Sequence, residues 1–200
     1  TDRKAAEAEL KAQAELQQML MEIATTYINI PLDQLDQSIH HSLGTIGRFV
    51  QADRAYIFDY DLDALTCSNT YEWCEDGIGA EIMNLQNISV EGMHDWLDMH
   101  KKGLPFVIAD VQLLNDDTHK DLKEILTAQH IQSLITIPLI DDNRLLGFIG
   151  FDSVRKTHHY SEKEQQLLHL YTQVLLNVKK RLHTENSLEE NKRFLENIID

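Results

Sequence analysis

The last 40 residues of the chain, 161–200, contain neither Gly nor Pro. They open with Ser161-Glu162-Lys163-Glu164, a capping box in which Ser and Glu satisfy free amides at a helix start. We therefore predict one continuous helix to Asp200, which would span about 60 Å. This is longer than one globular domain needs, so we expect residues 184–200 to be an exit helix or coiled-coil linker to another unit.

A second long helix is predicted over residues 1–29, which also lack Gly and Pro and are rich in strong helix formers. One stripe of this helix steps by three and four residues, which is typical of a coiled coil or bundle. The stripe consists of Ala12, Leu16, Met19, Ile23, Thr26 and Ile30. In the last helix Leu167, Val174, Leu188 and Leu195 share a heptad position that Arg181 interrupts. Both helices need a partner, so we expect a homodimer through them.

Between the long helices the chain alternates between helical and strand patterns. A helix is expected from Leu32 to about Gln51, and period-two alternation from Asp53 predicts a strand with Tyr56, Phe58 and Tyr60 on one face. Two apolar, β-branched stretches joined by the polar turn 141–144 predict a central hairpin. The hairpin strands are 133–140 and 145–154. Further strands are expected over 65–74 and 106–109, and further helices over 80–85, over 93–100 and after a Thr118 cap.

Composition excludes several classes of protein. The chain has 18 Lys and Arg against 33 Asp and Glu, a formal charge of −15, which disfavours nucleic-acid binding. No apolar run is long enough to cross a bilayer, so we expect no membrane insertion by this segment. The N-terminus lacks an initiator Met and is consistent with a segment of a longer protein. We expect the cysteines to be reduced and the module to lie in the cytoplasm. The module could stand in a soluble protein or in a membrane-anchored receptor.

Four stretches give this α+β plan a specific resemblance. They are residues 53–58 (DRAYIF), 105–111 (PFVIADV), 132–139 (QSLITIPL) and 145–151 (LLGFIGF). In order and spacing they resemble the GAF domain family over about residues 16–183. The resemblance implies a central antiparallel sheet, with the long terminal helices on one face and short helices over a ligand-binding face. Residues 1–30 would then be an N-terminal signalling helix.

Two further motifs resemble a subgroup of the family. Residues 71–74 (YEWC) and 150–154 (GFDSV) are similar to GAF domains of bacterial and archaeal multidomain sensors, of the histidine kinase or diguanylate cyclase type. The tail 191–200 resembles the linker that enters a following PAS or output domain. The resemblance implies a small-molecule or partner sensor in which the ligand lies between the sheet and the glycine-broken segment 75–103.

Aromatic residues in the segments facing that region suggest a ligand cavity. We predict that it is lined by Tyr56, Phe58, Tyr71, Trp73, Trp96 and Phe148. Asn69, Asp110 and Thr136 are candidate polar anchors. The alternative interpretation is an ordinary aromatic core, which the residue types alone favour slightly.

The sequence motifs argue against several cofactors. The Asn-Lys…Phe…Asp-Glu constellation of cyclic-nucleotide-binding GAF domains is missing, and neither Cys67 nor Cys74 is followed by His, as in GAF domains with a covalent bilin. The two cysteines should face opposite sides of their strand and be small buried residues, and haem is not expected. Adjacent histidines such as His40-His41 rarely chelate one metal. We interpret His94, His100, His119 and His130 as solvated; the alternative is that one of them is a haem ligand or responds to pH.

These observations leave three functional hypotheses. The first is a sensory GAF module that binds a small molecule and passes a change through its terminal helices to an output domain. The second is a ligand-free module that dimerises and aligns neighbouring domains. An enzyme such as a methionine-sulfoxide-reductase-type GAF domain is third, because it needs several grouped cysteines, and no phosphate loop, Gly-x-Ser-x-Gly or Gly-Gly-Asp-Glu-Phe motif is present.

Overall fold

The computed structural model describes residues 2–115 and 117–199 and has the expected α+β plan. Its centre is a six-stranded antiparallel sheet in the order β3-β2-β1-β6-β5-β4. The strands are β1 (Arg54–Asp61), β2 (Thr66–Cys74), β3 (Ile88–Ser89), β4 (Phe106–Ile108), β5 (Ser133–Asp141) and β6 (Arg144–Ser153). The helices are α1 (Asp2–Asn29), α2 (Leu35–Phe49), α3 (His94–Lys101), α4 (Lys120–Ala128) and α5 (Glu162–Ile199), with short 3-10 turns η1 (Leu32–Gln34) and η2 (Val111–Leu113).

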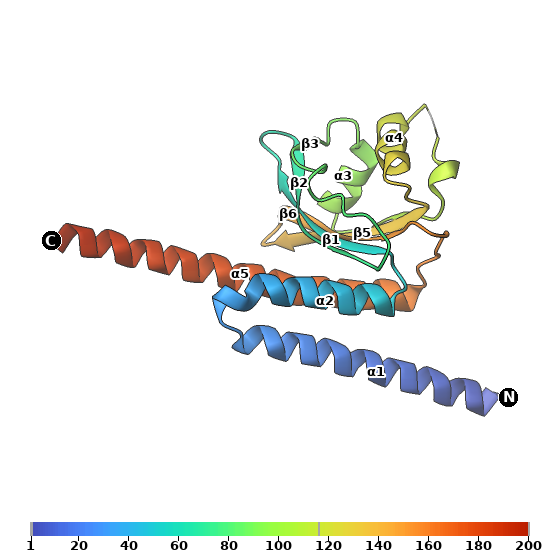
Figure 1. Cartoon of the computed structure of the whole chain (residues 1–200), viewed down its shortest axis with the longest axis horizontal. Coiled ribbons are helices and arrows are strands. Elements are labelled where there is room, and N and C mark those ends of the chain that lie inside the picture. Colours follow the sequence, from blue (N-terminus) through green and yellow to red (C-terminus); the bar gives the residue numbers. More distant parts are fainter. Residues whose placement is uncertain (1, 116, 200) are drawn as a thin grey trace.

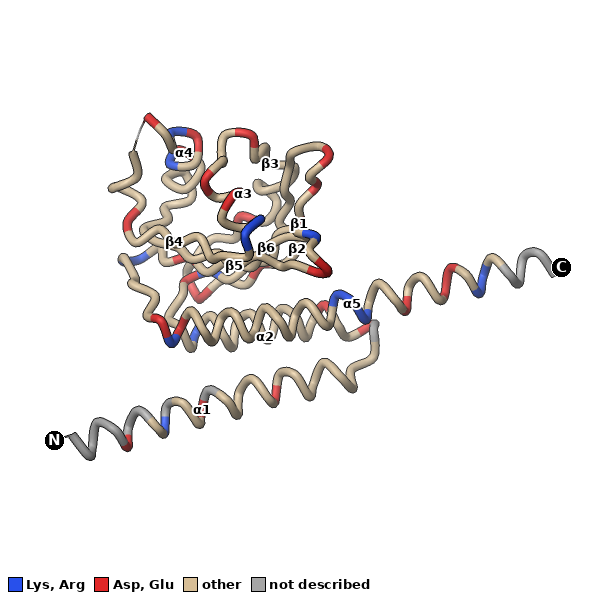
Figure 2. The backbone as a smooth tube through the Cα atoms, turned by 180° about the vertical axis from the view of Figure 1, so that it is seen from behind, with Lys and Arg blue, Asp and Glu red and all other residues tan. Residues whose placement is uncertain are grey.

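The sheet separates two layers of different character (Figure 1). Helices α2 and α5 lie side by side against one face, with α1 packed outside them. The other face is covered by α3, α4 and the loops around them, all of which belong to residues 75–132, which we call the insert. Figure 2 shows acidic residues in loops of the insert and at intervals along α5. The segregation of long helices to one face confirms the expected architecture.

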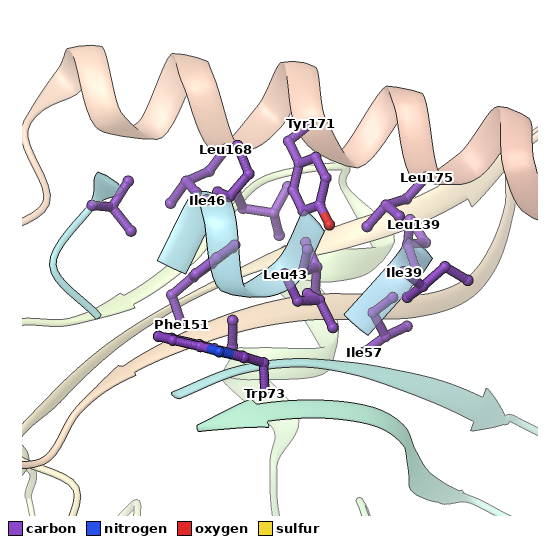
Figure 3. Packing of buried hydrophobic residues seen from close by; sticks show 14 of the residues in the cluster. Ile39, Leu43, Ile46, Ile57, Trp73, Leu139, Phe151, Leu168, Tyr171 and Leu175 are labelled. Carbon is purple, nitrogen blue, oxygen red and sulfur yellow. The ribbon is translucent and has the colours of Figure 1, made fainter. Parts of the chain in front are cut away.

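The core on the helix side joins α2, α5 and the central strands (Figure 3). Ile39, Leu43 and Ile46 of α2 point toward the sheet, and Leu168 and Tyr171 reach the same core from α5. The α2 stripe therefore has the predicted helical spacing. Burial of such side chains contributes about 1.5–3 kcal/mol each, so this layer is the main source of stability for the helices.

Two glycines of α2 allow that helix to approach the sheet closely. A Cβ atom at Gly44 would lie 2.7 Å from Nε1 of Trp73, and one at Gly47 would lie 2.6 Å from its ring. Both are tighter than ordinary carbon contacts. The indole of Trp73 thus fills the space where α2 has no side chains (Figure 3).

A β-bulge in β2 changes which side chains face which layer. The register of β1 and β2 shifts between Ile57 and Phe58, so that Phe58 pairs with Asn69 whereas Ile57 pairs with Tyr71, and Thr70 is the extra residue. Residues after the bulge therefore point to the face opposite to the one that strict alternation predicts. The expectation that Cys67 and Cys74 lie on opposite faces was wrong for this reason.

The insert departs from the sequence-based helix assignments in two places. Residues 80–85 form no helix but a turn over 82–84, because the amides of Glu81 and Ile82 donate to the Glu72 carboxylate at 2.9 and 3.0 Å. The helix expected after a Thr118 cap begins at Lys120, and its N-cap residue His119 makes no capping bond through its side chain. The short strand β3 was not predicted, whereas α3 and β4 were.

The β5–β6 hairpin forms as predicted. Its turn has positive φ angles at Asp142 and Asn143, a two-residue connection that suits the twist of antiparallel strands. Pro138 lies beyond the end of β4, which pairs only with residues 134–136 of β5. At Gly147 a Cβ atom would overlap the carbonyl oxygen of Phe58 on the neighbouring strand, so β1 and β6 require glycine there.

Helix α5 begins at the predicted capping box. The Ser161 amide donates to Oε2 of Glu164 at 2.7 Å, and the Glu164 amide donates to Oγ of Ser161 at 3.3 Å. The helix then continues without interruption for 38 residues. Within residues 2–115 and 117–199, no helix combines the length and apolarity that crossing a membrane requires.

Arg181, which interrupts the predicted heptad seam of α5, connects this helix to α1. Its Nη1 donates to the carbonyl oxygens of Tyr27 at 2.8 Å and Ile28 at 3.2 Å, which are among the last carbonyls of α1. A cation is favourable at a helix C-terminus, where carbonyl groups lack helical partners. Ala12, Leu16 and Leu195 also belong to the predicted seams, but their side chains lie outside the described part of the chain.

The close approach of β1 and β6 gives a stability prediction. Gly147→Ala should lower the free energy of unfolding by about 1–3 kcal/mol, because the added methyl group overlaps backbone atoms that cannot move independently. Gly79→Ala is the matched control, since a Cβ at Gly79 meets no atom within 4 Å. Urea unfolding followed by circular dichroism measures both variants, and equal stability of the two would contradict the register described here.

Candidate functional site

A cavity of about 50 Å³ lies between the insert side of the sheet and helices α3 and α4. The side chains that line it are mostly apolar or aromatic. They are Tyr56, Phe58, Tyr60, Cys67, Glu72, Leu85, Ile88, Val90, Met93, Trp96, Leu122, Ile125, Leu126, Gln129, Ile131 and Phe148. The cavity thus occupies the position that the sequence predicted for a ligand, between sheet and insert.

Aromatic rings form its wall on the sheet side. Phe58 and Phe148 stack with ring centroids 4.9 Å apart, and Tyr56 meets Phe58 edge to face at 5.4 Å. Trp96 reaches across from α3 and meets Phe148 edge to face at 5.4 Å. The Tyr56 ring can lie flat over β6 only because Gly150 has no side chain, since a Cβ there would overlap the ring.

Four of the six predicted aromatic residues line this cavity, and two do not. Tyr56, Phe58, Trp96 and Phe148 are in place. Tyr71 and Trp73 lie on the other face of the sheet, where Trp73 belongs to the helix-side core, so their assignment to the cavity was wrong. The β-bulge is the cause, because it reverses the alternation of β2 after residue 70.

None of the three predicted polar anchors lines the cavity. Asp110 uses Oδ1 to cap η2, accepting from the Gln112 amide at 2.9 Å. Thr136 is buried and bonded to His100 at 3.0 Å. Asn69 is buried on the insert face of β2, pairing with Phe58, but is not among the lining residues.

A chain of hydrogen bonds fixes α3 over the sheet. Trp96 Nε1 donates to the Tyr60 hydroxyl at 3.1 Å, and that hydroxyl meets His100 Nδ1 at 2.8 Å. Because the indole can only donate, the Tyr60 proton is available for Nδ1, and His100 Nε2 then donates to Thr136. Burial lowers the pKa of His100 to about 3, which keeps the ring neutral. Its interpretation as a solvated histidine was wrong.

A second network of buried polar side chains lies beside the cavity, where β1 and β6 pair. Arg54 donates from Nη2 to the Gln129 carbonyl at 2.6 Å, and its Nη1 lies 3.9 Å from Asp152 Oδ2. The Tyr56 hydroxyl donates to Asp152 Oδ1 at 2.7 Å. Burial raises the pKa of Asp152 to about 7, although the Tyr56 bond and Arg54 oppose the shift. This group ties α4 to the centre of the sheet.

Sequence reasoning missed Tyr60, Glu72, Gln129 and the apolar residues of α4. Tyr60 continues the alternation of Tyr56 and Phe58 and could have been found by that signal. Glu72 and Gln129 carry no such signal, because a polar residue in a strand or helix is usually solvated. In the described ranges no group of three or more His, Cys, Asp or Glu side chains could hold a metal ion.

The comparisons with known proteins identify the family. The model of the GAF domain family matches residues 34–175, and the chain belongs to this family. A homologous protein is the methanogenesis regulatory histidine kinase FilI of Methanothrix harundinacea (strain 6Ac), 29% identical over 150 residues. The match covers 72% of this chain and only 16% of that kinase. The chain is therefore homologous to a part of a signalling protein.

Solved structures with the same fold include domains of phytochromes and cyanobacteriochromes. The bacteriophytochrome RpBphP3 of R. palustris has a TM-score of 0.71 at 14% identity, covering 90% of this chain and 40% of that one. The phycocyanobilin-bound GAF domain of a cyanobacterial phytochrome has a TM-score of 0.68 at 16% identity, covering 85% and 96%. The PixJ GAF domain of Thermosynechococcus elongatus scores 0.60 at 18% identity, covering 80% and 96%. At these identities the likeness shows the fold alone.

The buried carboxyl group of Asp152 gives a prediction about pH. Its pKa is about 7 in the folded chain against an ordinary value of 3.8, so its contribution to stability is complete below pH 3.8 and is lost as pH rises through 7. Asn cannot ionise. The free energy of unfolding of Asp152→Asn relative to wild type should therefore rise by about 2 kcal/mol between pH 5 and pH 7.5.

Urea unfolding of both proteins at each pH measures this change. Comparing the two proteins cancels the titration of groups they share, including His100, whose lowered pKa acts in the opposite direction. A difference that does not vary with pH would show that Asp152 is ionised throughout.

Proposed function

We propose that the chain is the sensory module of a signal-transduction protein. It binds a small molecule in the cavity between sheet and insert and transmits a change through α1 and α5. The observation that supports this most is the position of the cavity, which lies across the sheet from the helices that lead out of the domain. The same strands, β1 and β6, contribute side chains to both.

The path from cavity to exit helix is short. Phe148 lines the cavity, and its neighbour Ile149 belongs to the core under α2 and α5. Tyr160, just before α5, donates through its hydroxyl to the Phe151 carbonyl at 3.0 Å. A ligand that binds two packings of the helices with different affinity needs only about 1–3 kcal/mol of coupling to bias an output domain.

Apolar side chains on the outer surfaces of α1 and α5 support dimerisation. Leu10, Met21 and Ile28 on α1 and Leu188 and Phe194 on α5 are each at least 65% exposed. Surfaces of this kind are common where another helix packs. We infer a homodimer formed by residues 1–30 and the exit helix, with a GAF domain over residues 16–183 and a linker over 184–200.

The parent protein is part of the same proposal. The FilI match suggests a histidine kinase, and the tail resembles a linker to a PAS, kinase or diguanylate cyclase domain. We expect the module to be non-catalytic and to act in the cytoplasm, alone or within a membrane-anchored receptor. We expect no covalent bilin, because neither cysteine is followed by His, and we expect no haem.

The small cavity also favours a second candidate function. A space of about 50 Å³, lined in part by Trp96, holds about four water-sized groups. A domain with so little room would serve as a ligand-free module that dimerises and aligns its neighbours. The two candidates differ in whether any molecule occupies the cavity.

Native mass spectrometry of the purified chain distinguishes them. The sensory proposal expects a dimer that carries extra mass from a bound small molecule. Ile125→Phe, which adds volume inside the cavity, should remove that mass and leave the dimer intact, whereas Leu113→Phe on the exposed surface of the insert should change neither. A dimer without extra mass, unaffected by Ile125→Phe, would favour the ligand-free alternative.

The dimer surface can be tested separately. Leu188→Asp combined with Phe194→Asp should weaken dimerisation at least tenfold, because each buried apolar side chain contributes about 1.5–3 kcal/mol. Sedimentation velocity over a concentration series measures the dissociation constant. Asn186→Asp, an exposed change on the same helix, controls for the added charge. A monomeric wild-type chain, or a dimer that the double variant leaves intact, would refute this arrangement.

A further inference from the structure

Arg54 lies between two possible partners on the insert side of the sheet and is only 3% exposed. Its Nη2 donates to the Gln129 carbonyl, just after α4, at 2.6 Å, and its Nη1 donates to Oε1 of the same residue at 3.4 Å. Asp152 pairs with Arg54 across the strands, but its Oδ2 lies 3.9 Å from Nη1, beyond hydrogen-bond distance. The guanidinium is thus bonded to the end of α4 and not to the neighbouring carboxyl group.

This cluster contains two carboxyl groups for one guanidinium. Glu72 is the second, because it pairs with Tyr56 on the insert face and its charge acts on both Arg54 and Asp152. A single cation neutralises only one of two carboxylates, and an unpaired buried charge is costly. One carboxyl group of the pair therefore keeps its proton more strongly than an exposed one does.

The bonding pattern assigns this proton to Asp152. Burial raises the pKa of Glu72, but its Oε2 accepts from the amides of Glu81 at 2.9 Å and Ile82 at 3.0 Å, and both bonds favour the ionised form. Asp152 accepts from the Tyr56 hydroxyl alone, and its Oδ2 has no partner among the described residues. Burial raises the pKa of Asp152 to about 7.

The other ionisable side chains near Asp152 do not change charge at the same pH. They are Asp53 of β1, Cys74 of β2 and Tyr160 before α5. Asp53 has its own cation, since Nη1 of Arg155 lies 3.3 Å from its Oδ1. Burial raises the pKa of Cys74 to about 11 and that of Tyr160 further, so both are neutral near pH 7. On the side of α4 the contact is the uncharged Gln129.

From this geometry we propose that protonation of Asp152 controls how firmly α4 covers the cavity. While Asp152 is neutral, Arg54 remains bonded to the end of α4. When the proton leaves to solvent, the new carboxylate attracts Arg54 away from that bond, and an opening of α4 that admits water relieves the buried negative charge. This opening also uncovers the cavity, because α4 contributes to its wall the side chains of Leu122, Ile125 and Leu126.

The direction of the effect follows from proton linkage. Opening exposes Asp152 to water, where a carboxyl group has a pKa of 3.8, against about 7 in the closed state. Opening therefore releases the proton, so it becomes more favourable as pH rises through 7. With these two values the equilibrium constant for opening increases about tenfold between pH 6 and pH 8.

Amide hydrogen exchange of the 200-residue chain at pH 6, 7 and 8 measures this opening. Low concentrations of urea identify the amides that exchange through local opening, because such openings expose little surface and respond weakly to urea. Amides of α2, in the helix-side core, report global unfolding. We expect α4 to exchange locally, with less protection than α2, and its protection to fall about tenfold from pH 6 to pH 8 after correction for intrinsic rates.

Matched variants test whether Asp152 is the cause. Asp152→Asn keeps the shape but cannot ionise, so the protection of α4 should no longer vary with pH. Asp98→Asn, an exposed change on α3, should keep the wild-type dependence. Glu72→Gln removes a charge that raises the pKa of Asp152, so the midpoint should move to lower pH. His119, the N-cap residue of α4, is present in all these proteins, and its titration cancels in the comparison.

The outcomes are decisive without reference to a ligand. Exchange of α4 through global unfolding alone, a local opening that does not vary with pH, or the same variation in Asp152→Asn would each overturn the proposal. If Asp152→Asn does not fold, ¹³C NMR of the Asp152 carboxyl carbon in the wild-type chain decides, because its midpoint and that of α4 protection must coincide near pH 7. The inference goes beyond the sensory proposal and requires no bound molecule, so native mass spectrometry tests that proposal independently.

Discussion

Burial of the central strands on both faces is the constraint on which the rest of the structure depends. Along the buried parts of β1 and β6, consecutive apolar residues belong to opposite cores. Ala55 and Ile57 pack under the helices, whereas Tyr56 and Phe58 face the insert. Because neighbouring residues of these strands pack into the two different layers, a displacement on the insert side changes the packing available to α2 and α5.

The sequence predicts the parts of the fold whose cause is local. The capping box at Ser161, the helical stripe of α2 and the alternation of β1 each act within a few residues, so pattern and structure agree. The insert is different, because its backbone is fixed by distant groups. Residues 80–85 turn toward the Glu72 carboxylate, and Asn87 adopts a positive φ of 54°. Neither effect leaves a periodic trace in the sequence.

The side chains around the cavity lie where the sequence predicts them on the strands with regular alternation, but not beyond the bulge. Tyr56 and Phe58 on β1 and Phe148 on β6 follow the period of a strand and line the cavity. One additional residue at Thr70 was enough to place Tyr71 and Trp73 on the other side. The predictions for polar residues were incomplete for another reason. Whether His100 or Glu72 is solvated depends on which distant segments cover it, and no single stretch of sequence contains that information.

The length of α5 has a mechanical consequence. Its first half is fixed in the core by residues such as Leu168 and Tyr171, while its last turns, after Leu182, extend beyond the sheet (Figure 1). Those turns are about 25 Å long, so a tilt of about 5° in the anchored half would move the far end by about 2 Å. Because the helix has no Gly or Pro at which to bend, its two halves move together as one rigid body. A rearrangement too small to see in the sheet would therefore be enlarged at the far end of the helix.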